Sequence, residues 1–126
     1  MKIPYLTIAA VLAGAALGAM ASQALKAQVP AAAFVVGEID VENAPGYFKE
    51  YVPLATRAVV DGGGKYVVRN GRSVSLYGEP PKALAIMQFE SLEKAQAVFG
   101  SKAYTDAKAI GDKYAKFRIY AVEGLP

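Results

Sequence analysis

Apolar residues follow two different patterns along the chain. Residues 3–21 form an unbroken, uncharged run behind a single lysine, whereas after residue 32 apolar residues recur in short β-branched stretches or at helical spacing. A short basic start, an apolar run and a small-x-small ending are typical of a secretory signal peptide. We therefore expect residues 1–21 to be a signal peptide, residues 22–32 a linker and residues 33–126 the folded domain.

The signal peptide has two candidate cleavage points and one competing interpretation. Cleavage fits after Ala21, and a second option follows Ala27. Alternatively, the run is about long enough to cross a bilayer, and Gly14 and Gly18 form a G-x-x-x-G pair that could pack helices in a membrane. Alanine contributes little transfer free energy, so the pattern favours cleavage over an uncleaved anchor. The expected location is periplasmic or secreted, with membrane contact only through the N-terminal segment if it is uncleaved.

After the linker, the pattern alternates between strands and helices. The predicted strands are residues 33–41, 65–69, 73–78, 83–90 and 116–123, and the predicted helices begin after Asn43, Ser91 and Ser101. Pro53 lies inside the first helix and has no N–H for the carbonyl of Lys49, so a kink or restart is expected there. Asn70-Gly71 favours a tight hairpin between the second and third strands.

This order predicts an α+β fold of the ferredoxin-like βαββαβ type, an antiparallel sheet with helices on one face. The other face still carries apolar residues, which we assign to Phe34, Val36, Val41, Leu84 and Ile86. A sheet that is apolar on both sides needs a second cover, and the domain has no spare element to supply one. We therefore expect a homodimer in which two sheets pack face to face.

Four segments carry a family resemblance. They are "VVGEIDVENAPGYFKEY", "GGKYVVRNG", "ALAIMQFESLEKAQAVFGSKAY" and the closing "VEG". Together they resemble the bacterial DUF-1330 family, a dimeric α/β-barrel group whose activity is unassigned. The resemblance implies a ferredoxin-like fold and a homodimer. Two positions depart from the family pattern: Tyr77-Gly78 stands where Glu-Gly is usual, and Gly111 where arginine is frequent. If those charges serve a shared site, this chain has lost or rebuilt it.

Composition excludes several kinds of chemistry. The chain has no histidine, cysteine or tryptophan, so histidine-ligated haem, Ser-His-Asp hydrolysis and cysteine nucleophiles are excluded. Its net charge of +3 is spread among interspersed charges, and no basic stripe suggests a nucleic-acid partner. We expect no cofactor and no metal. The acids of Asp40-x-Glu42 fit a strand-to-helix turn better than a cation site.

The glycine-rich stretch Gly62-Gly63-Gly64-Lys65 invites comparison with a phosphate-binding loop. A Walker A loop would need glycine where Val59 stands and Ser or Thr where Tyr66 stands. It also runs from a strand into a helix, whereas this stretch runs from a predicted helix into a predicted strand. We therefore interpret the glycines as a helix end and turn.

The remaining candidates for a ligand cleft are Glu38, Tyr47, Tyr66, Arg69, Glu79 and Tyr104. If Arg69 and Glu38 point into the space between the two sheets, they must pair or bind a ligand, because isolated buried charges are costly. The tyrosines could line the mouth of such a pocket. The plainer alternatives are exposed strand ends for the charges and ordinary packing for the tyrosines.

The sequence leaves two main functions open, beside a structural or assembly role. The first is a homodimer that is non-catalytic or binds a small-molecule ligand, since no nucleophile and base stand together. The alternative is a cofactor-independent enzyme, oxygenase- or isomerase-like, acting on a small acidic or aromatic molecule; its support is analogy with the fold. An enclosed cavity of about 300 Å³ or more, with Arg69 or Glu38 projecting into it, would favour the enzyme.

Overall fold

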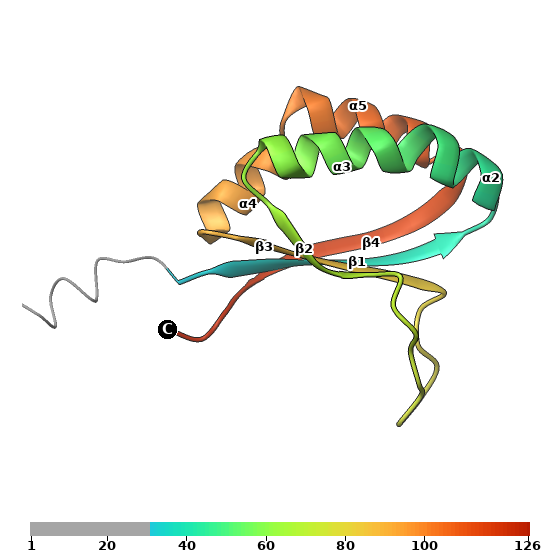
Figure 1. Cartoon of the computed structure of the whole chain (residues 1–126), viewed down its shortest axis with the longest axis horizontal. Coiled ribbons are helices and arrows are strands. Elements are labelled where there is room, and N and C mark those ends of the chain that lie inside the picture. Colours follow the sequence, from blue (N-terminus) through green and yellow to red (C-terminus); the bar gives the residue numbers. More distant parts are fainter. Residues whose placement is uncertain (1–30) are drawn as a thin grey trace, which may run out of the picture. The chain divides into compact units, whose positions relative to one another are not determined.

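Four antiparallel strands form one sheet in the order β2-β3-β1-β4, and the helices lie together on one side of it (Figure 1). The computed structural model describes residues 31–126, so the expected signal peptide and most of the linker lie outside the described residues. The elements are β1 (Ala33–Val41), α2 (Ala44–Gly46), the π-helical turn η1 (Tyr47–Tyr51), α3 (Val52–Asp61), β2 (Lys65–Arg69), β3 (Ala83–Phe89), α4 (Leu92–Phe99), α5 (Lys102–Gly111) and β4 (Ala115–Glu123). This arrangement confirms the α+β, ferredoxin-like prediction. Within residues 31–126, no helix is long and apolar enough to cross a membrane.

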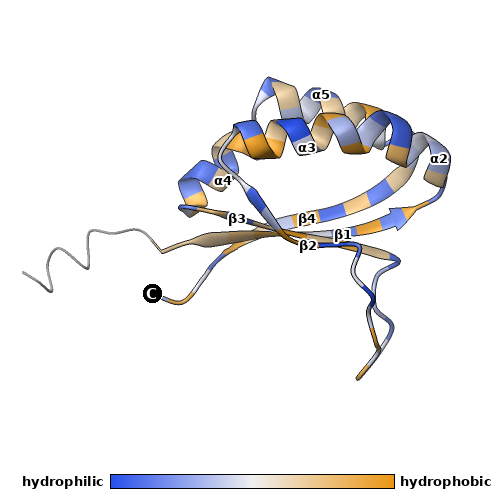
Figure 2. Cartoon of the chain, viewed as in Figure 1, coloured by the Kyte–Doolittle hydropathy of each residue, from blue (hydrophilic) through white to orange (hydrophobic). Residues whose placement is uncertain are grey.

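Side-chain alternation gives the sheet a buried face and an open face. Hydrophobic and hydrophilic residues alternate along β4 (Figure 2), and in β1 the buried Val35 and Ile39 point toward the helices. Phe89 of β3 and Val59 of α3 are almost fully buried between the two layers. The core therefore lies between the helices and one face of the sheet.

The predicted hairpin strand at residues 73–78 is absent, and this correction leaves four strands in the described chain. Residues 70–82 run as an exposed loop, and β2 pairs directly with β3. Asn70 has a positive φ of 51°, yet the chain does not turn back there. The physical reason is competition for β2: the apolar run 83–89 pairs with both β1 and β2, whereas a strand at 73–78 would bury little because every second residue is Ser or Tyr.

A second correction concerns Val41, which the sequence pattern assigned to the open face. Val41 packs partly buried against the core cluster beneath the helices. Residues of one strand share a face when they are two apart, and Val41 therefore lies on the same face as Val35 and Ile39. Phe34 and Val36 have the opposite parity and do lie on the open face.

The helix after β1 is interrupted at the predicted proline. Pro53 occupies the first turn of α3, and the residues before it form η1, in which the Val52 N–H donates to the carbonyl of Tyr47. Proline has no N–H for the carbonyl of Lys49, so the chain restarts its hydrogen-bond ladder at this point. The π-helical turn carries Tyr47 and Tyr51, which are both buried.

The glycine triplet ends α3, as the sequence predicts. Gly62 donates to the carbonyl of Ala58 at 3.1 Å, and Gly63 has a φ of +93°, a left-handed conformation that favours glycine. Gly64 donates to the carbonyl of Val59 at 2.8 Å and leads into β2. The stretch is a helix end followed by a turn.

We predict that Gly64→Ala destabilises the domain by about 1–3 kcal/mol through overpacking. A Cβ on Gly64 would lie 2.6 Å from Cζ of Phe89 and 2.7 Å from Cγ1 of Val59, and both side chains are held in the core. Urea unfolding measures the loss. Gly71→Ala is the matched control, since a Cβ there meets nothing within 4 Å; equal stability of the two variants would contradict the packing argument.

Candidate functional site

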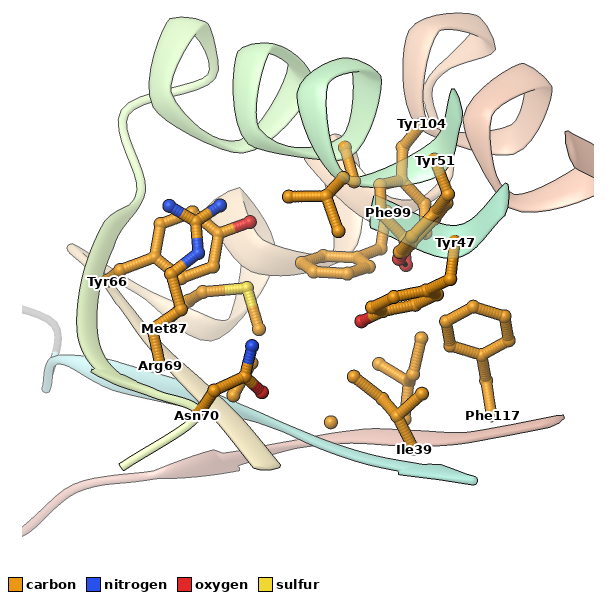
Figure 3. A pocket seen from close by; sticks show the side chains of 15 residues that line it. Ile39, Tyr47, Tyr51, Tyr66, Arg69, Asn70, Met87, Phe99, Tyr104 and Phe117 are labelled. Carbon is orange, nitrogen blue, oxygen red and sulfur yellow. Dashed lines mark hydrogen bonds between the residues drawn. The ribbon is translucent and has the colours of Figure 1, made fainter. Parts of the chain in front are cut away.

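A cavity of about 40 Å³ lies between the helix layer and the inner face of the sheet (Figure 3). It is lined by Gly37, Ile39, Tyr47, Tyr51, Val52, Ala55, Tyr66, Arg69, Asn70, Ala85, Met87, Phe99, Tyr104, Phe117 and Ile119. Most of these side chains are apolar or aromatic, and the polar groups are four phenols, one amide and one guanidinium. Arg69 and Asn70 are exposed, so the cavity reaches solvent at the end of the edge strand β2. Its volume admits only a few water molecules.

Two buried tyrosines meet at the back of the cavity. The hydroxyls of Tyr51 from η1 and Tyr104 from α5 are 2.9 Å apart and share a hydrogen bond. Burial raises the pKa of both phenols, and the pKa of Tyr104 reaches about 12. Both hydroxyls therefore stay protonated near neutral pH, as hydrogen-bonding groups and not as bases.

Tyr47 and Tyr66 form the sides of the cavity. The ring of Tyr47 lies 5.2 Å from that of Tyr51, centroid to centroid, and its hydroxyl faces the space between the helices and β2 (Figure 3). Burial raises the pKa of both Tyr47 and Tyr66, with the nearby cation of Arg69 partly offsetting it. These two phenols are neutral as well.

A β-bulge in β2 aims Arg69 at the cavity. Tyr66 pairs with Met87 and Arg69 with Ala85, and the extra residue between them is Val67. Residues three apart on a regular strand point to opposite faces. The extra residue brings Arg69 to the same inner face as Tyr66, as bulges beside functional sites often do.

The Arg69 guanidinium closes the mouth of the cavity. Its carbon atom Cζ lies 4.2 Å from the centroid of the Tyr66 ring, and Nη2 donates to the hydroxyl of Thr56 on α3. Thr56 in turn donates to the carbonyl of Val52 at 2.7 Å. Across residues 31–126, no carboxylate forms an ion pair with Arg69, although six other ion pairs are present. The cavity thus has a cation at its entrance whose charge is not neutralised by a described neighbour.

The structure brings four of the six predicted cleft residues together and separates the other two. Tyr47, Tyr66, Arg69 and Tyr104 line the cavity. Glu38 lies on the open face of the sheet, 3.6 Å from Nε of Arg118 through its Oε2. Glu79 lies in the exposed loop after β2.

Arg69 and Glu38 therefore do not meet the condition that both point into the space beyond the open face. The bulge at Val67 turns Arg69 to the inner face, and Glu38 pairs with its cross-strand neighbour Arg118. Sequence reasoning also left Tyr51 out of the site. The signal for it was present, because Tyr51 stands four residues after Tyr47 on the same apolar helix face. Met87 and Phe99 also line the cavity, but their places in the sequence indicated only ordinary core packing.

We predict that Tyr51→Phe and Tyr104→Phe each destabilise the fold by about 1–3 kcal/mol, since each leaves one hydroxyl buried without its partner. The double variant should lose clearly less stability than the sum of the two single losses, because it leaves no unpaired hydroxyl. Urea unfolding of the three variants gives the coupling, and additive losses would contradict the shared hydrogen bond.

The same pair gives the wild-type fold a pH dependence. The pKa of Tyr104 is raised in the fold from 10.0 to about 12. Its contribution to the free energy of unfolding is therefore complete below pH 10 and is lost as the pH rises toward 12. Tyr104→Phe should flatten this alkaline decline, which unfolding curves at pH 9 to 12 would record.

Residues 32–125 match the profile of a family described as "Domain of unknown function (DUF1330)". The chain belongs to this family. The match spans β1 to β4 and confirms the family resemblance seen in the sequence. No curated protein matches the chain.

DUF1330 membership gives context to one departure from the family pattern. Gly111, where the resemblance leads us to expect arginine, lies against the cavity wall: a Cβ there would be 2.6 Å from Cδ2 of Tyr51 and 2.9 Å from Cζ of Phe117. A larger side chain at this position requires Tyr51 to move. Glycine at this position therefore accommodates the buried tyrosine pair.

Solved structures resemble this DUF1330 chain at low sequence identity. A methylated RPA0582 protein has 14% identity and a TM-score of 0.58, with 77% of this chain and 83% of that chain covered; a second RPA0582 structure gives its source as Rhodopseudomonas palustris. SnoaB from Streptomyces nogalater, a cofactor-independent oxygenase, has 8% identity and a TM-score of 0.56, with 76% and 95% covered. An ethyl tert-butyl ether d (ethd) family protein from Bacillus halodurans has 16% identity and a TM-score of 0.52, with 75% and 99% covered. At such identities these likenesses establish the fold alone.

Proposed function

We propose that this domain binds a compact organic acid in the cavity beneath its helices, and that it works as a homodimer joined through the open face of the sheet. One observation carries the ligand proposal: the guanidinium of Arg69 is held at the mouth of a tyrosine-lined cavity and pairs with no carboxylate among the described residues. The export signal predicted for residues 1–21 makes the proposed location periplasmic or secreted.

The chemistry of the lining fits a carboxylate better than a neutral ligand. The planar guanidinium offers paired N–H groups that match the two oxygens of a carboxylate. The phenols of Tyr47 and Tyr66 stay protonated, so they are able to donate hydrogen bonds to an anion. Deeper in the cavity, Met87 and Phe99 supply an apolar surface for the body of the acid.

Cavity size restricts the ligand. A volume of about 40 Å³ is far below the roughly 300–1,000 Å³ typical of pockets for larger ligands. Acetate is close to what the cavity admits, whereas an aromatic acid requires Arg69 and Tyr66 to swing outward. Arg69 is exposed and is bound to the helix layer through Thr56, whereas Tyr66 is partly buried against the core, so the opening breaks one hydrogen bond of Arg69 and part of the packing of Tyr66.

Binding is favoured over catalysis by the protonation states of the lining residues. An oxygenase- or isomerase-like reaction needs a group that removes a proton from the substrate. The raised pKa values keep Tyr51 and Tyr104 protonated, arginine does not deprotonate in proteins, and no carboxylate or lysine of the described residues lines the cavity. The cavity is also smaller than the enclosed space that would favour an enzyme. The likeness to SnoaB supports the enzyme alternative through fold only.

The dimer proposal rests on the apolar character of the open face. Strand pairing places Phe34, Val36, Val68, Leu84, Ile86, Tyr120 and Val122 on this face, and each is at least partly exposed. These residues extend over all four strands, with the Glu38–Arg118 pair among them. A contiguous apolar surface of this kind marks an interaction site, and a second copy offers the same surface by two-fold symmetry.

Thermal denaturation with matched acids and amides tests the ligand proposal. Acetate and benzoate should raise the melting temperature of the protein, because a ligand that binds only the native state stabilises it. Acetamide and benzamide, which have nearly the same shape without the charge, should not. The proposal fails if no acid shifts the transition, or if each acid and its amide shift it equally.

A further inference from the structure

An arm projects from the domain on the side opposite the helices. It comprises residues 71–82, between β2 and β3, and Figure 1 shows it extending beyond the open face of the sheet. β2 and β3 are adjacent antiparallel strands, with the Asn70 N–H donating to the carbonyl of Leu84 at 2.9 Å. Two to five residues are enough to connect such strands. The arm is therefore much longer than the connection requires.

The end of the arm exposes large apolar side chains in a defined turn. Val74 is 71% exposed, Leu76 is 86% exposed and Tyr77 is fully exposed. The Ser75 hydroxyl donates to the carbonyl of Gly78, whose φ of +73° closes the turn. A large apolar side chain left in water forgoes the favourable free energy of burial, so this cluster at the end of an arm indicates a surface that becomes covered.

The root of the arm forms one wall of a mainly apolar groove on the same chain. The groove has a volume of about 420 Å³, and Val41, Phe48, Val68 and Leu84 line it together with Arg72, Ser73 and Lys82 of the arm itself. Phe48 is 50% exposed. One protomer thus carries a projecting apolar tip and an open apolar groove, which are the two halves of a self-complementary contact. Two-fold symmetry would form such a contact twice.

We infer that the arm embraces a second copy of this chain, its tip (residues 74–77) docking in the groove at the root of the partner's arm. The inference rests on the proposed sheet-face dimer, since the arm extends on the side where that partner would sit. Any copy that covers the open face meets an arm on this side. The arm would then lock a dimer that the sheet faces form.

A single tryptophan reports directly on the tip. The chain contains no tryptophan, so Tyr77→Trp introduces one fluorophore at a position that is fully exposed in the protomer. In the dimer, its emission should lie at shorter wavelength than in urea-unfolded protein, and acrylamide should quench it less. The same substitution combined with Ile86→Asp supplies the monomeric reference, in which the emission should match that of a solvent-exposed indole. Phe48→Ser in the Tyr77→Trp background should expose the indole again while light scattering still reports a dimer.

The possible outcomes distinguish the arm contact from the sheet-face dimer. A dimer with a protected indole that Phe48→Ser exposes supports the inference, and Leu76→Ser with Tyr77→Ser should then weaken the dimer at least about tenfold. A dimer with an exposed indole overturns the arm contact and leaves the sheet-face dimer standing. An indole that stays protected in Phe48→Ser overturns the groove as its docking site. A monomer at micromolar concentration overturns both the arm and the proposed dimer.

Discussion

Ile86→Asp is expected to convert the proposed dimer into monomers, weakening self-association by at least about 1,000-fold. Ile86 lies on β3 between Val36 of β1 and Val68 of β2, near the middle of the open face. In a two-fold interface the substitution appears twice. Each copy loses the burial of an isoleucine, roughly 1.5–3 kcal/mol, and gains a carboxylate that must be buried without a partner at a cost of several kcal/mol.

The protomer itself should tolerate the change, because Ile86 is only partly buried within it. Light scattering at micromolar concentration measures the mass, and circular dichroism confirms that the monomer is folded. Leu54→Asp is the matched control: Leu54 is an exposed leucine near the start of α3 on the helix layer, where an acid is compatible with the helix dipole. If Ile86→Asp stays dimeric, or if Leu54→Asp dissociates equally, the sheet face is not the interface.

Much of the fold could be predicted because its signals are local. Helix starts at Ser91 and Ser101 follow from side chains that cap the first turn, and both serines accept the expected backbone N–H. The restart at Pro53 follows from a missing N–H. The glycine triplet ends a helix because Gly63 takes a conformation that other residues avoid. Each of these features depends on a few neighbouring residues.

The failed hairpin prediction and the bulge that the sequence did not reveal both depend on pairing between distant segments. The hairpin at Asn70-Gly71 has a strong local signal, yet residues 83–89 take the place beside β2 because they are apolar on both faces and complete the sheet. The bulge at Val67 has no local signal at all. It exists only in the register between β2 and β3, and it decides which face Arg69 occupies.

The candidate site shows the same division. Tyr47 and Tyr104 could be placed near a cleft because helical spacing puts them on buried faces. The grouping of these tyrosines with Arg69, and the exclusion of Glu38, required the bulge. We therefore propose a ligand on the inner face of the sheet and a second copy of the chain on its open face. Substitutions on one face can therefore test one proposal without disturbing the other.

Arg69→Ala is expected to raise the dissociation constant for benzoate by about 10- to 100-fold, since a hydrogen-bonded charge contributes roughly 1.5–3 kcal/mol. Among the described residues, the guanidinium is the only cationic group lining the cavity, so no described neighbour replaces it. Arg69→Lys should recover only part of the affinity, because an ammonium keeps the charge but lacks the paired N–H groups that match a carboxylate.

Arg72→Ala is the matched control for this experiment. Arg72 lies three residues further along, in the exposed arm and outside the cavity lining, so its removal changes the net charge equally without touching the site. Calorimetric titration of benzoate into the wild type and the three variants gives the comparison. If Arg69→Ala and Arg72→Ala lose affinity equally, the loss reflects the change in net charge and not a contact between Arg69 and the ligand. Unchanged affinity in Arg69→Ala would show that the Arg69 cation does not contribute to binding, and the proposal of an acidic ligand would then lose its basis.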